Sequence, residues 1–82
     1  MTRTTFVLTA GERRVLAAMR DAHDSGMEWL GLTNVAIKAD VATLDAAEAL
    51  LAIPVQLGYV EQVGRRGAIY RLTADGRGMA AP

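Results

Sequence analysis

Apolar residues recur at helical spacing in the first third of the chain. Thr9 stands three residues before Glu12, the spacing of a capping box in which each residue satisfies a backbone N–H of the other. Gly26 follows and can end a helix in the left-handed conformation. The pattern predicts a first helix from about Ala10 to Ser25. The residues expected on its inner face are Val15, Leu16, Met19, Ala22 and His23.

Two short elements are predicted next. The partly alternating residues 27–32 predict a small edge strand. Thr33 can cap a second short helix over residues 34–39, because a threonine hydroxyl accepts from a free N–H of the first turn. The residues expected to be buried on that helix are Val35, Ala36 and Ile37.

A third helix is predicted from about Ala46 to Leu57. Asp45 precedes Glu48 by three residues, which is again capping-box spacing. Pro54 removes one backbone donor and clashes with the preceding turn, so we expect a kink there or an early end followed by an extra turn. The expected buried residues are Ala47, Leu50, Leu51 and Val55.

The last third of the chain has the alternation of strands. Residues 59–63 and 68–72 are strand-like and enclose Gly64-Arg65-Arg66-Gly67, a hairpin loop with glycine at both ends. Thr73 predicts a cap and a final half-turn. In the second strand one face should carry Ala68, Tyr70 and Leu72, and the other Ile69 and Arg71.

This order of elements resembles a winged helix-turn-helix domain, the DNA-binding module of many bacterial repressors. The residues that carry the resemblance are Leu57-Gly58-Tyr59-Val60-Glu61, the basic hairpin, and Tyr70-Arg71-Leu72-Thr73 followed by Gly76-Arg77, as in MarR-like and PadR-like regulators. The resemblance implies an α+β fold with three helices and a C-terminal β-hairpin wing. It implies a single domain over residues 1–82, with an ordered core at about residues 8–78.

Length and composition favour a small domain with a partner. The chain has 82 residues, and 15 of its apolar residues are alanines, which bury little area. A core of this size supplies only about 3–5 kcal/mol of net stability, so a homodimer or another protein partner is expected. The absence of cysteine excludes disulfides, thiolate metal sites and cysteine nucleophiles, and it fits a cytoplasmic location.

The charges are unevenly distributed although the net charge is zero. Residues 1–20 carry net +3, residues 21–61 net −6 and residues 62–82 net +3. Basic ends and an acidic middle predict separate surfaces. Binding of DNA would require the arginines of both ends to converge on one face.

The resemblance implies where duplex DNA would bind. The third helix would enter the major groove, and the wing would contact phosphates or the minor groove through Arg65 and Arg66. The third helix lacks Lys and Arg and presents Asp45 and Glu48, which fit capping better than phosphate contact. Weaker candidates for DNA contact are Thr43, Lys38, Gln56, Arg13 and Arg14.

A second hypothesis is a protein–protein interaction module, an adaptor or a phage-type inhibitor, that uses the acidic surface without binding DNA. No enzyme is expected: the consecutive residues His23-Asp24-Ser25 point about 100° apart on a helix and cannot form a catalytic triad. No cofactor or metal is predicted. No apolar run is long enough for a signal peptide or a membrane span, so we expect a soluble, cytoplasmic protein.

Overall fold

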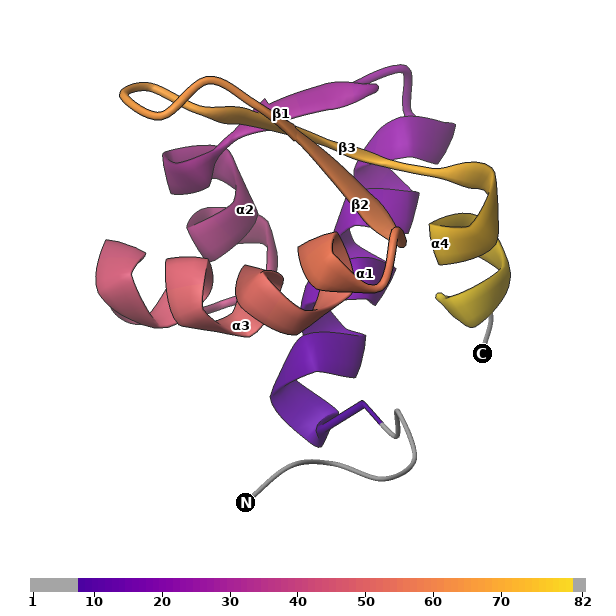
Figure 1. Ribbon diagram of the computed structural model, residues 1–82, viewed down its shortest axis with the longest axis horizontal. Helices are drawn as coiled ribbons and strands as arrows, with labels where there is room; N and C mark the ends of the chain where they lie inside the picture. The colour runs from indigo at the N-terminus through magenta and orange to yellow at the C-terminus, as the bar shows by residue number, and fades with distance from the viewer. Residues whose placement is uncertain (1–7, 81–82) are drawn as a thin grey trace.

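Two layers make up the computed structural model, which describes residues 8–80 (Figure 1). The helices are α1 (Ala10–Asp24), α2 (Leu32–Lys38), α3 (Leu44–Gln56) and α4 (Ala74–Met79). The antiparallel sheet has the order β1–β3–β2 and is built from β1 (Trp29–Gly31), β2 (Val60–Val63) and β3 (Ile69–Leu72). The α+β class is as predicted, with a fourth helix where a half-turn was expected and with β1 joined to the hairpin.

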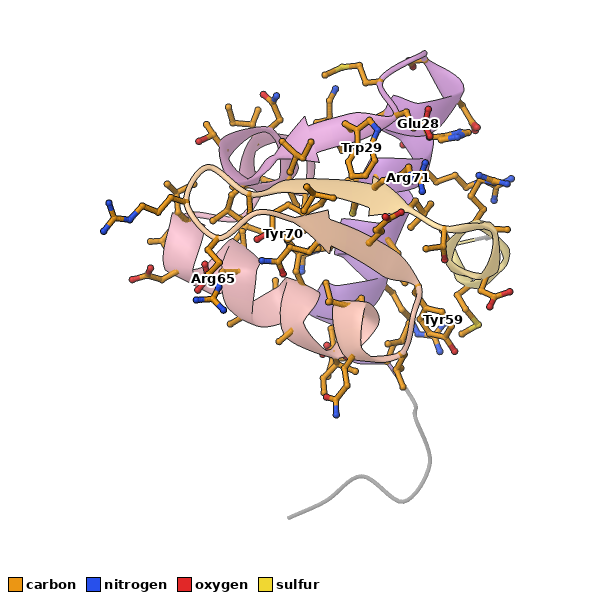
Figure 2. All side chains as sticks on the ribbon, turned by 45° about the horizontal axis from the view of Figure 1, so that its top comes forward. Glu28, Trp29, Tyr59, Arg65, Tyr70 and Arg71 are labelled. Carbon is orange, nitrogen blue, oxygen red and sulfur yellow. The ribbon has the colours of Figure 1, made fainter. Side chains whose placement is uncertain are left out.

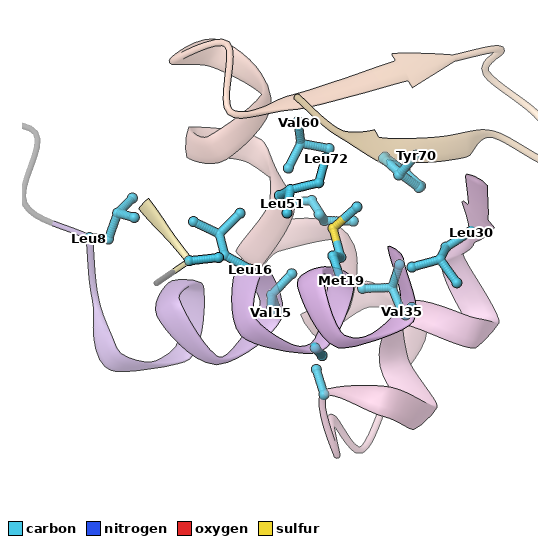
Figure 3. Close-up of a cluster of buried hydrophobic side chains, with 14 of the residues drawn as sticks. Leu8, Val15, Leu16, Met19, Leu30, Val35, Leu51, Val60, Tyr70 and Leu72 are labelled. Atoms are coloured by element: carbon cyan, nitrogen blue, oxygen red, sulfur yellow. The ribbon is translucent and has the colours of Figure 1, made fainter. Parts of the chain in front are cut away.

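Helix α1 packs against the other helices and against β3, so it organises the core. Its predicted capping box is present: the Glu12 N–H donates to the Thr9 hydroxyl at 3.1 Å, and the Thr9 N–H donates to the Glu12 carboxylate at 2.9 Å. The alternation predicted for β3 is confirmed, because Ala68, Tyr70 and Leu72 are buried while Ile69 is exposed. Figure 3 shows the cluster, whose largest members include Leu16, Met19, Leu30, Leu51, Tyr70 and Leu72.

The two central helices begin earlier than predicted. Helix α2 starts at Leu32, and its cap is Gly31 without a side-chain hydrogen bond, so the prediction of Thr33 as the cap is wrong. Gly31 is paired with Ile69 in the sheet, and that pairing leads the chain directly into the helix. Helix α3 is capped by Thr43 and not by Asp45, since the Thr43 hydroxyl accepts from the Ala46 N–H at 3.1 Å.

Several burial predictions for the middle of the chain need correction. Ile37 is 71% exposed, since α2 turns only Val35 and Ala36 toward the core. Leu50 and Val55 are only partly buried. Helix α3 does not end before Pro54, which is buried, but continues to Gln56.

The base of the hairpin is fixed to α4 by a close backbone contact. Thr73 caps α4 by accepting from the Gly76 N–H at 3.1 Å, and its hydroxyl donates to the Gly58 carbonyl at 2.7 Å. A Cβ atom added at Gly76 would lie 1.9 Å from the Tyr59 carbonyl oxygen. Only glycine fits there, and the contact sets the direction in which the hairpin leaves the core.

No helix within residues 8–80 combines the length and the hydrophobicity needed to cross a membrane. The apolar residues Phe6 and Val7, which precede the first cap, lie outside the described residues.

Candidate nucleic-acid interface

The predicted wing is present and places two arginines at an exposed turn. Strands β2 and β3 pair with Val63 opposite Ile69, and residues 64–68 connect them. Gly64 and Gly67 have φ values of 88° and 63°, a region that favours glycine, so the sequence Gly-Arg-Arg-Gly suits this tight reversal. Arg65 and Arg66 between them are exposed.

The charges of the wing loop are not neutralised by contact with the domain itself. Among residues 8–80, ion pairs are formed by Arg20 with Asp24 and by Arg71 with two glutamates, whereas Arg65 and Arg66 form none. Two guanidinium groups on a loop with small neighbours can approach phosphate oxygens closely. The loop is therefore a candidate anion-contacting surface.

A groove runs between the wing and the helix-turn-helix unit. One cavity of about 350 Å³ is lined by the start of α2, by Leu44 and Glu48 of α3, and by Arg65 and Tyr70 of the hairpin. An adjoining cavity of about 340 Å³ shares Glu48, Arg65 and Tyr70 with it. Figure 2 shows Arg65 on the side of the hairpin that faces α3. The wing and α3 thus border one continuous surface.

The α3 side of this surface is acidic and apolar. Asp45 and Glu48 are exposed, Leu44 is 47% exposed, and residues 44–56 contain no Lys or Arg. Gln56 is exposed at the other end of the helix, about 12 Å along the axis from Glu48 at 1.5 Å per residue. The hydroxyl of Thr43 is engaged in capping.

The remaining basic candidates lie away from the wing. Lys38 borders a separate cavity with Ala18, Asp21, Ala22 and Ser25, between α1 and α2. Arg13 and Arg14 are exposed on the first turns of α1. The start of α1 lies at the opposite end of the molecule from the wing loop (Figure 1). Among residues 8–80, the structure does not bring the basic residues of the two ends together beside the wing, so the convergence expected for DNA binding is not seen there and the wing loop stands alone as the basic surface.

A third arginine of the hairpin is held on the outer face of the sheet. Arg71 donates to Glu28 at 3.0 Å and to Glu61, and its guanidinium carbon lies 4.7 Å from the centre of the Trp29 ring. The hydrogen bonds to Glu28 and then Glu61 raise the pKa of Arg71. Figure 2 shows Glu28, Trp29 and Arg71 grouped around β1 and β3. Trp29 is 36% exposed there.

The buried hydroxyl-bearing residue of the hairpin is Tyr70. It is 2% exposed and lines both cavities beside Glu48. Burial, and then the negative charge of Glu48, raise the pKa of the Tyr70 phenol. The sequence does not reveal this proximity, because the two residues lie on elements that meet only in the folded chain.

The histidine at the end of α1 forms no catalytic relay with its neighbours. His23 Nδ1 lies 3.8 Å from an Asp24 oxygen, while the Ser25 hydroxyl donates to the Asp21 carbonyl at 2.9 Å. Within the part of the chain that the structure describes, no group of three or more His, Cys, Asp or Glu residues could hold a metal ion.

The fold is similar to that of a solved DNA-binding protein. BpsR of Bordetella bronchiseptica, solved to explain how 6-hydroxynicotinic acid regulates its DNA binding, superposes with a TM-score of 0.75 at 25% sequence identity. The match covers 94% of this chain and 53% of that chain, so this chain spans about half the length of BpsR. No family model and no curated protein matches the chain. The structural similarity shows a winged-helix fold of the regulator type, as the resemblance in sequence implied.

Proposed function

We propose that this chain binds duplex DNA and regulates transcription, with the Arg65–Arg66 loop as its main contact. The observation that carries the proposal is the pair of exposed guanidinium groups, without ion-pair partners in residues 8–80, on a hairpin beside α3. Such groups suit phosphate oxygens or the minor groove. The similarity to BpsR, whose DNA binding is the subject of its structure, supports this role.

Helix α3 would contribute less to affinity than the wing. Its exposed carboxylates, Asp45 and Glu48, repel phosphates and can read only a donor such as cytosine N4. Binding is therefore expected to tolerate many sequences and to gain from a homodimer that presents two wings. Thr43 and Gln56, at the two ends of α3, are the secondary candidates beside the wing. Lys38, Arg13 and Arg14 lie away from the wing, so no contact with the same stretch of duplex is assigned to them.

The test is a fluorescence anisotropy titration of a random-sequence duplex at several salt concentrations. Removing two phosphate contacts in Arg65→Ala/Arg66→Ala should make the negative slope of log K against log salt less steep by about 1.8. The variant Arg20→Ala/Arg77→Ala removes the same charge elsewhere and should keep the slope of the original protein. Equal slopes for the protein and its wing variant would refute the assignment.

A second function is favoured by the character of the α3 surface. Leu44 and Ile37 are 47% and 71% exposed, and Asp45 and Glu48 are exposed on the same helix-turn-helix unit. An acidic, partly apolar face suits a basic protein segment, as in an adaptor or a phage-type inhibitor. Absence of DNA binding at low salt would favour this function over the first.

A further inference from the structure

Glu48 of α3 and Arg65 of the wing face the same groove from opposite sides. Both residues line the cavity of about 350 Å³ and the adjoining one of about 340 Å³. They are the only Glu and Arg that border either cavity among the described residues. The packing of α3 against the hairpin thus places an acidic residue on the groove that the wing loop borders.

The two side chains share a groove without a fixed contact. Both are exposed, and no ion pair joins them within 4.0 Å among the described residues, in contrast to Arg71 and its two glutamates. Without a bidentate geometry the carboxylate does not orient the guanidinium for a ligand. Its remaining effect is to offset part of the positive charge of Arg65.

Screening by solvent does not remove this effect. The Debye length at physiological salt is about 8 Å, so charges that line one groove within this distance still interact through solvent. The charge of Glu48 also reaches the buried hairpin face, since it contributes to the raised pKa of Tyr70. Arg66, next along the loop, borders neither cavity.

We infer that Glu48 weakens DNA binding by offsetting part of the positive charge of Arg65. The wing of the free protein is therefore less attractive to phosphate than its two arginines alone would make it. This inference rests on the proposed function, because it concerns the same surface. Glu48 is a tuning residue for the wing: its negative charge offsets part of the positive charge of Arg65 and so weakens the attraction of Arg65 to phosphate.

The experiment measures duplex affinity for Glu48→Gln, which keeps the shape of the side chain and removes its charge. The matched control is Asp45→Asn, an exposed acidic residue of the same helix turn that borders neither cavity. Both substitutions are then repeated in the Arg65→Ala and Arg66→Ala backgrounds. Asp45→Asn measures the general repulsion between α3 and phosphate.

The expected result is a gain of about two- to fivefold in affinity for Glu48→Gln beyond that of Asp45→Asn, the range of an exposed ion pair. This excess should persist with Arg66→Ala and vanish with Arg65→Ala. Equal gains for the two helix variants, or an excess that survives Arg65→Ala, would overturn the inference while leaving DNA binding intact. Absence of salt-dependent binding in every variant would instead refute the proposed function.

Discussion

The hairpin carries arginines in two opposite environments. At its tip, Arg65 and Arg66 are exposed and form no ion pair within residues 8–80. On its outer face, Arg71 is bound to Glu28 and Glu61 and stacks on Trp29. Arginine thus links the three strands on the outer face of the sheet, whereas at the tip of the hairpin it is exposed without an ion-pair partner.

The role of each arginine in the hairpin therefore depends on which carboxylates the fold places within reach of it. Glu28 is 43 residues from Arg71 in sequence, yet the antiparallel order β1–β3–β2 sets them side by side. Within residues 8–80, no strand pairs with the tip of the hairpin. Its charges therefore remain available to a partner, while those of the sheet hold the wing in place.

The largest expected effect is at the base of the hairpin. Gly76→Ala would press a Cβ against the Tyr59 carbonyl, which no rotamer change can relieve, so it should destabilise the fold by about 3 kcal/mol. Thermal unfolding followed by circular dichroism should show a midpoint lower by roughly 10 °C or more. Gly78→Ala, in the same helix with open space at its Cβ, is the control and should be neutral or stabilising. Equal midpoints for the two variants would show that the base does not depend on this contact.

The next largest effect distinguishes the tip of the hairpin, which is expected to contribute to DNA affinity, from its base, which is expected to contribute to stability. Arg65→Ala/Arg66→Ala should lower duplex affinity about tenfold at low salt and change the free energy of unfolding by less than about 0.5 kcal/mol. Affinity by anisotropy and stability by urea unfolding should be measured on the same preparations. A large loss of stability would place the wing arginines among the structural residues.

A smaller effect is expected from Arg71→Gln. The substitution removes both ion pairs and the stacking on Trp29, so it should lower the urea midpoint slightly, and less so at high salt. Duplex affinity should fall no more than for Arg20→Gln, which loses a single longer pair to Asp24 at 3.9 Å. If Arg71→Gln lost as much duplex affinity as Arg65→Ala/Arg66→Ala, the outer face of the sheet would contribute to DNA binding as much as the tip, contrary to this prediction.

The smallest effect appears only at alkaline pH. The pKa of Tyr70 is raised in the folded protein above its ordinary value of 10.0, so the unfolded chain ionises first as pH increases. The contribution of Tyr70 to stability is complete below pH 10.0 and is lost as pH rises through the folded pKa. Between pH 8 and 11, the free energy of unfolding measured with urea should fall less in Tyr70→Phe than in the original protein. Identical profiles would contradict a buried phenol beside Glu48.

Local patterns were sufficient for the elements that depend on neighbouring residues. The Thr9–Glu12 box specifies the start of α1, because both partners lie within one turn. The two glycines of the wing loop and the alternation of β3 likewise predict the hairpin and its buried face. Such signals need no knowledge of tertiary contacts.

Features that depend on distant residues were missed. The start of α2 follows from the pairing of Gly31 with Ile69, so the nearby Thr33 was a misleading cap. The stack of Trp29 on Arg71 and the groove shared by Glu48 and Arg65 arise where separate elements meet. The position of Arg13 and Arg14 away from the wing likewise depends on how α1 crosses the domain, which no local pattern encodes.

Contact between the wing tip and DNA is tested most directly by an NMR titration of the protein with a random-sequence duplex at low salt. We expect the largest amide shifts at residues 64–67, with smaller shifts along the groove at Glu48, while the indole N–H of Trp29 stays in place. Shifts confined to the outer face of the sheet around Trp29 and Arg71, with the loop unchanged, would contradict the claim that the wing tip contacts DNA.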